Sequence, residues 1–143
     1  TDEARRPLAE MPPVTVNFKD MIHRIHSGEN LSQDYTVYGF GGTAHNFNEK
    51  RFPGERQQCS ICHEDGTMDV PLPAEALSTV VTESSVVVSE VQATRAACTS
   101  CHDSAAANAH ALTQTDISGA ESCAVCHSNS DLLSISAVHA LTP

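Results

Sequence analysis

The sequence contains few large aromatic side chains. It has no Trp, two Tyr and four Phe, and all of these aromatic residues lie between Phe18 and Phe52. Residues 53–143 contain none. Because a soluble domain normally fills its core with aromatic and branched aliphatic side chains, we expect something other than side chains to fill the interior of the second half.

Positive charge and long apolar runs are also scarce. The net charge is −10, and residues 59–143 carry one basic residue, Arg95, against ten acidic residues. This balance excludes nucleic acid as a partner, since its binding needs clustered Lys and Arg. An acidic surface can steer a basic partner, but a plain solvated face is an equally good interpretation.

No run approaches the roughly 18 apolar residues of a membrane helix, so we expect no transmembrane segment.

The cysteines all belong to one repeated motif, C-x-x-C-H. Three copies account for all six: the first motif is Cys59, Cys62 and His63, the second is Cys98, Cys101 and His102, and the third is Cys123, Cys126 and His127. This spacing is typical of haem c attachment, in which two thiols form thioethers with the vinyl groups of one haem. The adjoining histidine supplies the proximal nitrogen to the iron. The sequence therefore predicts three covalently bound haem c groups, which would supply the missing aromatic bulk.

Two other uses of the cysteines explain less of the pattern. A structural zinc site would pair two C-x-x-C units and leave the third without a partner. Thiol–disulfide chemistry would leave the three adjoining histidines unexplained. Haem c is attached outside the cytoplasm, so we expect an extracellular or outer-membrane location, with the periplasm as the alternative. No signal peptide is recognisable at Thr1, so an exported protein would be represented by a mature or truncated form.

Histidines outnumber the axial positions that remain. Besides the proximal histidines, the sequence contains His23, His26, His45, His110 and His139, whereas three irons need at most three more ligands. His23 and His26 share a helical face in "MIHRIH" and could serve two neighbouring haems. His110 and His139 each follow a motif in apolar surroundings, where a satisfied core histidine is the other interpretation. His45, in a Gly-rich loop, has the weakest case, because a loop histidine is often only polar surface.

The chain reads as one domain with an arm. Residues 1–16, rich in Pro, are predicted to be extended, and residues 17–143 to form a single three-haem domain. A helix is expected over residues 17–28, capped by Asn17 or Asp20 and ended by Gly28. Residues 78–91 alternate weakly and predict a hairpin or an extended excursion. We expect a mainly α fold with much irregular structure, in which short helices surround three haems with little or no sheet.

The linking residues carry a family resemblance. "FKDMIHRIHSGENL", "YTVYGFGGTAHNF" and "RFPGERQQCSICHEDGT" resemble the haem domains of the OmcA/MtrC family of outer-membrane multihaem cytochromes, and the last two motifs with their surroundings resemble the final haem sites of the same domain. The likeness covers roughly residues 17–141. It implies closely packed bis-histidine haems and extracellular electron transfer. It also implies that His23, His26, His110 and His139 are distal ligands, while a match for His45 is common but not universal in the family.

The chain departs from the family in one respect. Haem domains of this family typically carry five haems, with two further motifs before the "IHxIH" helix, and only residues 1–16 precede it here. The chain is then a fragment or a three-haem version, and its surplus histidines are ligands of missing haems or of a haem in a neighbouring subunit.

The leading function is therefore a non-enzymatic electron carrier with no catalytic residues. Its expected partners are other multihaem cytochromes or copies of itself, or a mineral, electrode or soluble acceptor. A polymeric cytochrome filament and a reductase with an open haem site are the alternatives.

Overall fold

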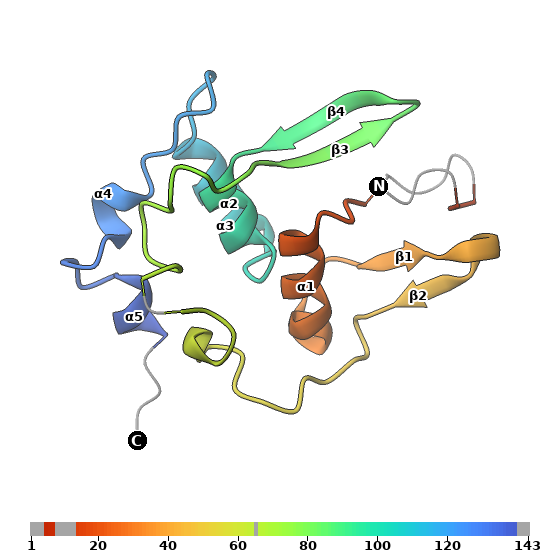
Figure 1. Cartoon of the computed structure of the whole chain (residues 1–143), viewed down its shortest axis with the longest axis horizontal. Coiled ribbons are helices and arrows are strands. Elements are labelled where there is room, and N and C mark those ends of the chain that lie inside the picture. The colour runs from red at the N-terminus through yellow and green to blue at the C-terminus, as the bar shows by residue number, and fades with distance from the viewer. Residues whose placement is uncertain (1–4, 8–13, 65, 140–143) are drawn as a thin grey trace.

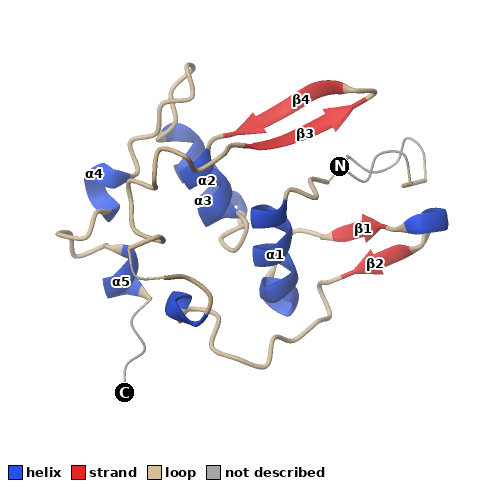
Figure 2. Ribbon diagram, in the orientation of Figure 1, coloured by secondary structure: helices blue, strands red, loops and turns tan. Residues whose placement is uncertain are grey.

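The computed structural model describes residues 5–7, 14–64 and 66–139. Its helices are α1 (Phe18–Ser27), α2 (Ala93–Thr99), α3 (Ala105–Thr113), α4 (Ala124–His127) and α5 (Ile135–Val138), and its strands are β1 (Thr36–Tyr38), β2 (Ala44–Asn46), β3 (Thr79–Glu83) and β4 (Val86–Val91). Long irregular segments connect them (Figure 2). Most of the predicted arm, residues 1–4 and 8–13, lies outside the described residues, so the arm and the single-domain organisation remain predictions.

The prediction of a mainly α fold with little or no sheet is wrong. Together with three short 3-10 helices (Gly28–Asn30, Phe40–Gly42 and Cys59–Ile61), the helices hold 34% of the described residues, and strands or bridges hold 16%. The strands form two separate antiparallel hairpins, β1–β2 and β3–β4. Figure 1 shows both hairpins projecting toward the same side of the molecule, with α4 and α5 on the opposite side and α1 between.

The β3–β4 hairpin confirms the hairpin alternative predicted for residues 78–91. Its strands are rich in Val and Thr, whose branched side chains favour extended backbone. The strands pair from Thr79 opposite Val91 to Glu83 opposite Val86, with a register shift after Val81. At the turn, Ser84 and Ser85 both have positive φ, 49° and 63°. A two-residue turn of this kind usually contains Asn or Gly, so "SS" gives little sequence signal for it.

Helix α1 confirms the predicted helix over residues 17–28. Asn17 occupies the N-cap position, although its side chain makes no capping hydrogen bond. Gly28 ends the helix with φ 39°, and its N–H donates to the Arg24 carbonyl. A Cβ at Gly28 would lie 2.0 Å from the Lys50 carbonyl oxygen. Only glycine therefore fits where the end of α1 meets the loop around residue 50.

The apolar core of the described residues is very small. Its buried hydrophobic residues are Tyr35, Val70 and Ala96. Tyr35 is 1% exposed, its ring lies 5.9 Å from that of Phe47, and its hydroxyl donates to the Thr15 carbonyl. Three such side chains cannot account for the folding of a chain of this length. The structure therefore agrees with the sequence in requiring something else in its interior.

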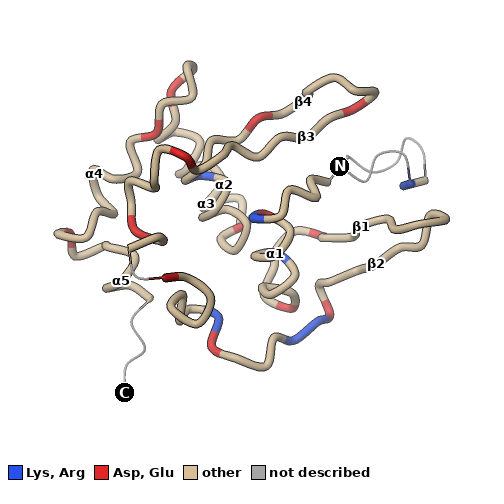
Figure 3. Tube along the Cα trace, viewed as in Figure 1, with Lys and Arg blue, Asp and Glu red and all other residues tan. Residues whose placement is uncertain are grey.

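Acidic and basic residues concentrate in different parts of the molecule. In Figure 3 the segments around α4 and α5 show only acidic positions, whereas Lys and Arg gather in α1 and the loop between β2 and the first motif. No helix of the described residues is long and apolar enough to cross a bilayer.

Candidate haem-binding sites

Each motif closes on itself through one turn of helix. The backbone N–H of the motif histidine donates to the carbonyl of the first cysteine in all three: His63 to Cys59 at 2.9 Å, His102 to Cys98 at 2.8 Å and His127 to Cys123 at 3.0 Å. Residues three and four apart in such a turn lie on one face. The two thiols and the imidazole of each motif are therefore presented together, as attachment of one haem requires.

Each motif histidine faces the imidazole of a second histidine, which we call the facing histidine. The ring centroids of His63 and His23 are 5.9 Å apart, those of His102 and His139 are 5.9 Å apart, and those of His127 and His110 are 6.3 Å apart. A metal ion holds an imidazole nitrogen at about 2.0–2.1 Å, so two rings on opposite sides of one ion have centroids about 6 Å apart. The spacing in all three pairs is that of two axial ligands.

The facing histidines come from three different helices. His23 lies in α1, His110 lies in α3 and His139 directly follows α5. Ser104 caps α3 by accepting the N–H of Ala107, and Ser134 caps α5 by accepting the N–H of Ala137. These caps fix where each short helix begins and hence where its histidine lies. The second and third motifs are thus each followed by a short helix that positions a histidine.

Hydrogen bonds fix which ring nitrogen carries the hydrogen in one motif histidine, His127, and in one facing histidine, His139. The Nδ1–H of His127 donates to the Leu133 carbonyl at 2.8 Å, and the Nδ1–H of His139 donates to the Ile135 carbonyl at 3.0 Å. A carbonyl oxygen can only accept, so Nδ1 carries the hydrogen in each ring, and in the neutral ring Nε2 has the free lone pair. Metal-ligating histidines commonly donate their other ring N–H in this manner.

The ring of His23 is half-buried, and its pKa responds to this position. Burial lowers the pKa of His23, and the nearby imidazoles of His63 and His26 lower it further. The neutral form that a metal ligand needs is therefore favoured. Its Nδ1 is buried without a hydrogen-bond partner in the described part of the chain.

The remaining two histidines do not face a motif histidine. The ring of His26 stacks on Phe52 with centroids 4.7 Å apart. His45 is exposed on β2 and is the strand partner of Val37 on β1. Its Nε2 lies against the backbone of Gly39. Of the five histidines outside the motifs, His26 and His45 are therefore the two that have no motif histidine opposite them among the described residues.

The second motif lies beside both of the others. The Sγ of Cys101 lies 3.9 Å from the His23 carbonyl oxygen, next to the first site. On the other side, burial and, to a smaller extent, the charges of Cys123 and Glu121 together raise the pKa of Cys98 to about 11. Burial also raises the pKa of Cys59, with a contribution from Cys101. The two thiols of the second motif thus adjoin different neighbouring sites.

Two carboxylates hold the second motif in place, and sequence reasoning missed both. Asp103 directly follows His102, and its two carboxylate oxygens accept the N–H groups of Ser32 and Gln33 at 2.7 Å each. Glu121 accepts the N–H groups of Thr94 and Arg95 at 3.0 and 2.6 Å. The only sequence signal was an acidic residue next to a motif, which does not reveal a partner far along the chain.

The residues present fit covalent haem. All six cysteines are free rather than disulfide-bonded. A haem bound at each motif would cover exposed apolar side chains that lie in or near the motifs: Ile61, Val125, Leu112, Leu133 and Val138. The described residues contain no group of three or more His, Cys, Asp or Glu that could hold a zinc ion. The zinc interpretation therefore loses its geometric basis.

A family model described as outer membrane cytochrome MtrC/MtrF-like, domains II/IV, matches residues 2–140. Together with the three motifs, this match defines a multihaem c-type cytochrome domain involved in electron transfer. The chain belongs to the MtrC/MtrF-like outer-membrane cytochromes, which confirms the resemblance drawn from its sequence. Neither a curated protein nor a solved structure matches it significantly.

Proposed function

We propose that the chain binds three haem c groups and carries electrons along them without acting as an enzyme. The observation that carries the proposal is that each motif histidine faces one further imidazole at axial-ligand spacing. In this assignment the six cysteines form the thioethers, and His63, His102 and His127 are the proximal ligands. The distal ligands are His23, His139 and His110 respectively.

The residues then have three tasks. The cysteines would anchor each macrocycle, the paired histidines would ligate its iron, and the small Ala-rich helices would let the backbone approach the rings closely. When bound, the haems supply one-electron exchange between ferric and ferrous iron. Because both axial positions are taken, substrate has no open iron to bind, which favours a carrier over a reductase. Bis-histidine ligation also favours lower potentials than Met/His ligation.

We infer that the second haem lies between the first and the third. The support is the second motif, whose Cys101 thiol adjoins the His23 backbone and whose Cys98 thiol adjoins Cys123. Electrons entering at one end of the chain would then leave at the other through the second haem. The acidic positions around α4 and α5 (Figure 3) suit an approach by a basic partner at that end.

We further propose that the protein acts at the outer-membrane or extracellular surface. Family membership supports this location. Other multihaem cytochromes are the expected partners, and a mineral, an electrode or a soluble acceptor is the expected final recipient.

The test begins with the protein matured in a host that attaches haem c. Intact-mass measurement should find three haems, and EPR should find only low-spin ferric iron. Carbon monoxide should not bind to the reduced protein. Changing His23, His110 or His139 to Met should raise the potential of one haem each, whereas the matched control His45→Met should raise none. Fewer haems, carbon monoxide binding, or an equal effect of His45→Met would overturn the assignment.

A second candidate function is assembly into a filament in which copies share haem contacts. The supporting observation is that His26, on the same helix as His23, faces no motif histidine and stacks on Phe52 instead. It is thus a spare imidazole close to the first haem site. Light scattering and cryo-electron microscopy of the concentrated holoprotein test this candidate. Filaments that disappear in His26→Ala would support it, and monomers at all concentrations would exclude it.

A further inference from the structure

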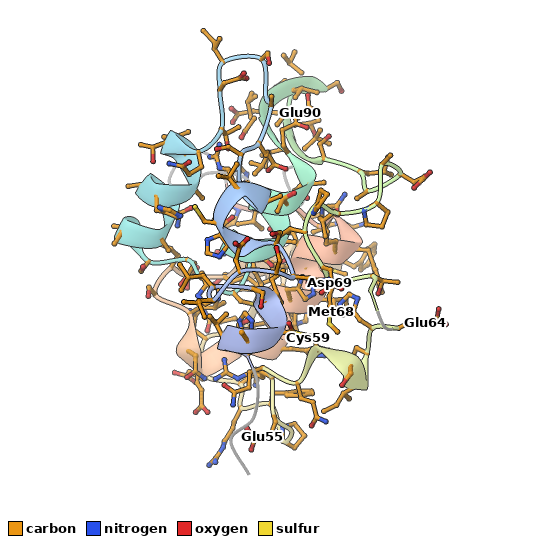
Figure 4. The ribbon with its side chains drawn as sticks, turned by 90° about the vertical axis from the view of Figure 1, so that its left-hand side faces the viewer. Glu55, Cys59, Glu64, Met68, Asp69 and Glu90 are labelled. Carbon is orange, nitrogen blue, oxygen red and sulfur yellow. The ribbon has the colours of Figure 1, made fainter. Side chains whose placement is uncertain are left out.

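The three motifs differ in the residue that follows the proximal histidine. This residue is Glu64 after the first motif, Asp103 after the second and Ser128 after the third. Glu64 is exposed and projects away from the chain (Figure 4). Asp103 is 3% exposed. Only the second site therefore has a buried carboxylate next to its proximal ligand.

Asp103 is held in place by donors that carry no charge. Its carboxylate accepts the backbone N–H groups of Ser32 and Gln33, and its own carbonyl accepts the Nδ2 of Asn108 at 2.9 Å. No Lys or Arg of the described residues forms an ion pair with it. The hydrogen bonds satisfy the carboxylate, but its negative charge is not neutralised by a cation.

The nearest basic residue in the sequence, Arg95, has acidic neighbours of its own. It lies in α2 and lines a surface depression together with Glu90 and Asp116. Its backbone N–H donates to the carboxylate of Glu121. The second motif is therefore bordered by Asp103 on one side and Glu121 on the other.

We propose that Asp103 lowers the reduction potential of the second haem below those of the first and third. This inference rests on the proposed function, in which His102 and His139 ligate that iron. A negative charge stabilises ferric over ferrous iron, and its effect grows as the local dielectric constant falls. The buried Asp103 acts through protein, whereas the exposed Glu64 is screened by water and salt. Asp103 is a positioning and tuning residue rather than an iron ligand.

The consequence is that the electron has its highest energy in the middle of the path. With the second haem between the other two, electrons reside on the first and third haems and cross the second at a higher energy. Transfer between the two ends is then controlled by one buried carboxylate.

The test is a redox titration of the holoprotein with Asp103→Asn, followed optically and by EPR. The wave of the second haem is identified by its shift in His139→Met, because Met/His ligation raises the potential. In Asp103→Asn this wave should move upward, with the ferrous-to-ferric ratio at fixed potential rising about tenfold, equivalent to about 59 mV for one electron. The matched control Glu64→Gln should move the wave of the first haem by clearly less.

Ser32→Pro separates the charge from the hydrogen bonds. It removes one N–H donor to Asp103 and keeps the carboxylate, and Leu31 already has the extended backbone, φ −71° and ψ 138°, that a following proline requires. The proposal expects no upward shift of the second wave in this variant. An equal upward shift in Ser32→Pro and Asp103→Asn would show a purely structural role and overturn the inference.

The unmodified protein gives an independent check if Asp103→Asn does not assemble. The second haem must have the lowest of the three potentials, and any other order overturns the inference. Loss of the low-spin bis-histidine spectrum in the unmodified protein would instead overturn the proposed function.

Discussion

The imidazole planes of His110 and His127 stand almost perpendicular, at 88°. The planes of His23 and His63 differ by only 30°, and those of His102 and His139 by 50°. The three sites thus share a ring spacing but differ in ring orientation. Ring orientation affects the electronic structure of the iron that two such ligands share.

The first prediction is that the third site gives a distinctive EPR signal. Perpendicular axial imidazoles leave the iron orbitals that π-bond with them close in energy, so low-spin ferric iron gives a highly anisotropic spectrum with one very large g value. The smaller angle at the first site separates these orbitals and gives an ordinary rhombic spectrum. We expect His110→Met to remove the highly anisotropic signal and leave the rhombic one, as measured at liquid-helium temperature.

The control for this experiment is His45→Met, which should leave both signals unchanged. If the anisotropic signal survives in His110→Met but disappears in His23→Met, the assignment of distal ligands is wrong.

The second prediction concerns folding without haem. Because the described residues bury only three hydrophobic side chains, we expect Cys98→Ala combined with Cys101→Ala to prevent cooperative folding. Circular dichroism melting and the dispersion of a proton–nitrogen NMR spectrum measure this. The matched control changes Ser100 to Ala within the same motif and keeps both thiols. A two-haem product with a sharp melting transition would show that the side chains suffice.

The third prediction concerns the Glu121 carboxylate. It accepts the N–H groups of Thr94 and Arg95 at the start of α2, whose own N-cap residue, Gln92, makes no side-chain cap. Glu121→Ala should lower the free energy of unfolding by about 1–3 kcal/mol, since it leaves two N–H donors without an acceptor. Urea unfolding of the holoprotein, followed at the Soret band, measures the loss.

The exposed Glu75 provides the comparison. Glu75→Ala should change the free energy of unfolding by less than about 0.5 kcal/mol, as is usual for a surface substitution. Equal losses in the two variants would mean that the Glu121 contacts contribute nothing.

The fourth prediction is a pH dependence that involves Asp20. This residue is 4% exposed, and its Oδ2 accepts the Nε–H of Arg24 at 2.9 Å. Burial raises the pKa of Asp20 above its ordinary value of 3.8 and outweighs the lowering effect of Arg24. The folded state then holds this proton more tightly than the unfolded chain does. Stability contributed by Asp20 is therefore lost as the pH rises from 3.8 through the raised pKa.

Asp20→Asn should remove this loss of stability with rising pH. The urea midpoint of the variant, measured at a series of pH values from 4 upward, should fall less steeply than that of the unmodified protein. The exposed Glu49, changed to Gln, controls for the loss of a carboxyl group. If the Asp20→Asn profile runs parallel to that of the unmodified protein, burial does not control this carboxyl group.

The sequence by itself determined the features that depend on neighbours along the chain. The cysteine spacing predicts the attachment motifs, because a single helical turn gathers two thiols and an imidazole. The same local logic predicted α1 and its end at Gly28, where backbone geometry admits only glycine. Counting histidines against irons also predicted that two would be left over.

Only the tertiary structure decided the features that join distant segments. It paired His63 with His23, and left His26 stacked on Phe52 although both α1 histidines share a helical face. It brought Asp103 to Ser32 and Glu121 to Thr94, and it set the strand register of both hairpins. Ring pairs, carboxylate contacts and strand registers depend on packing between segments far apart in sequence, and residue type or local spacing does not encode that packing.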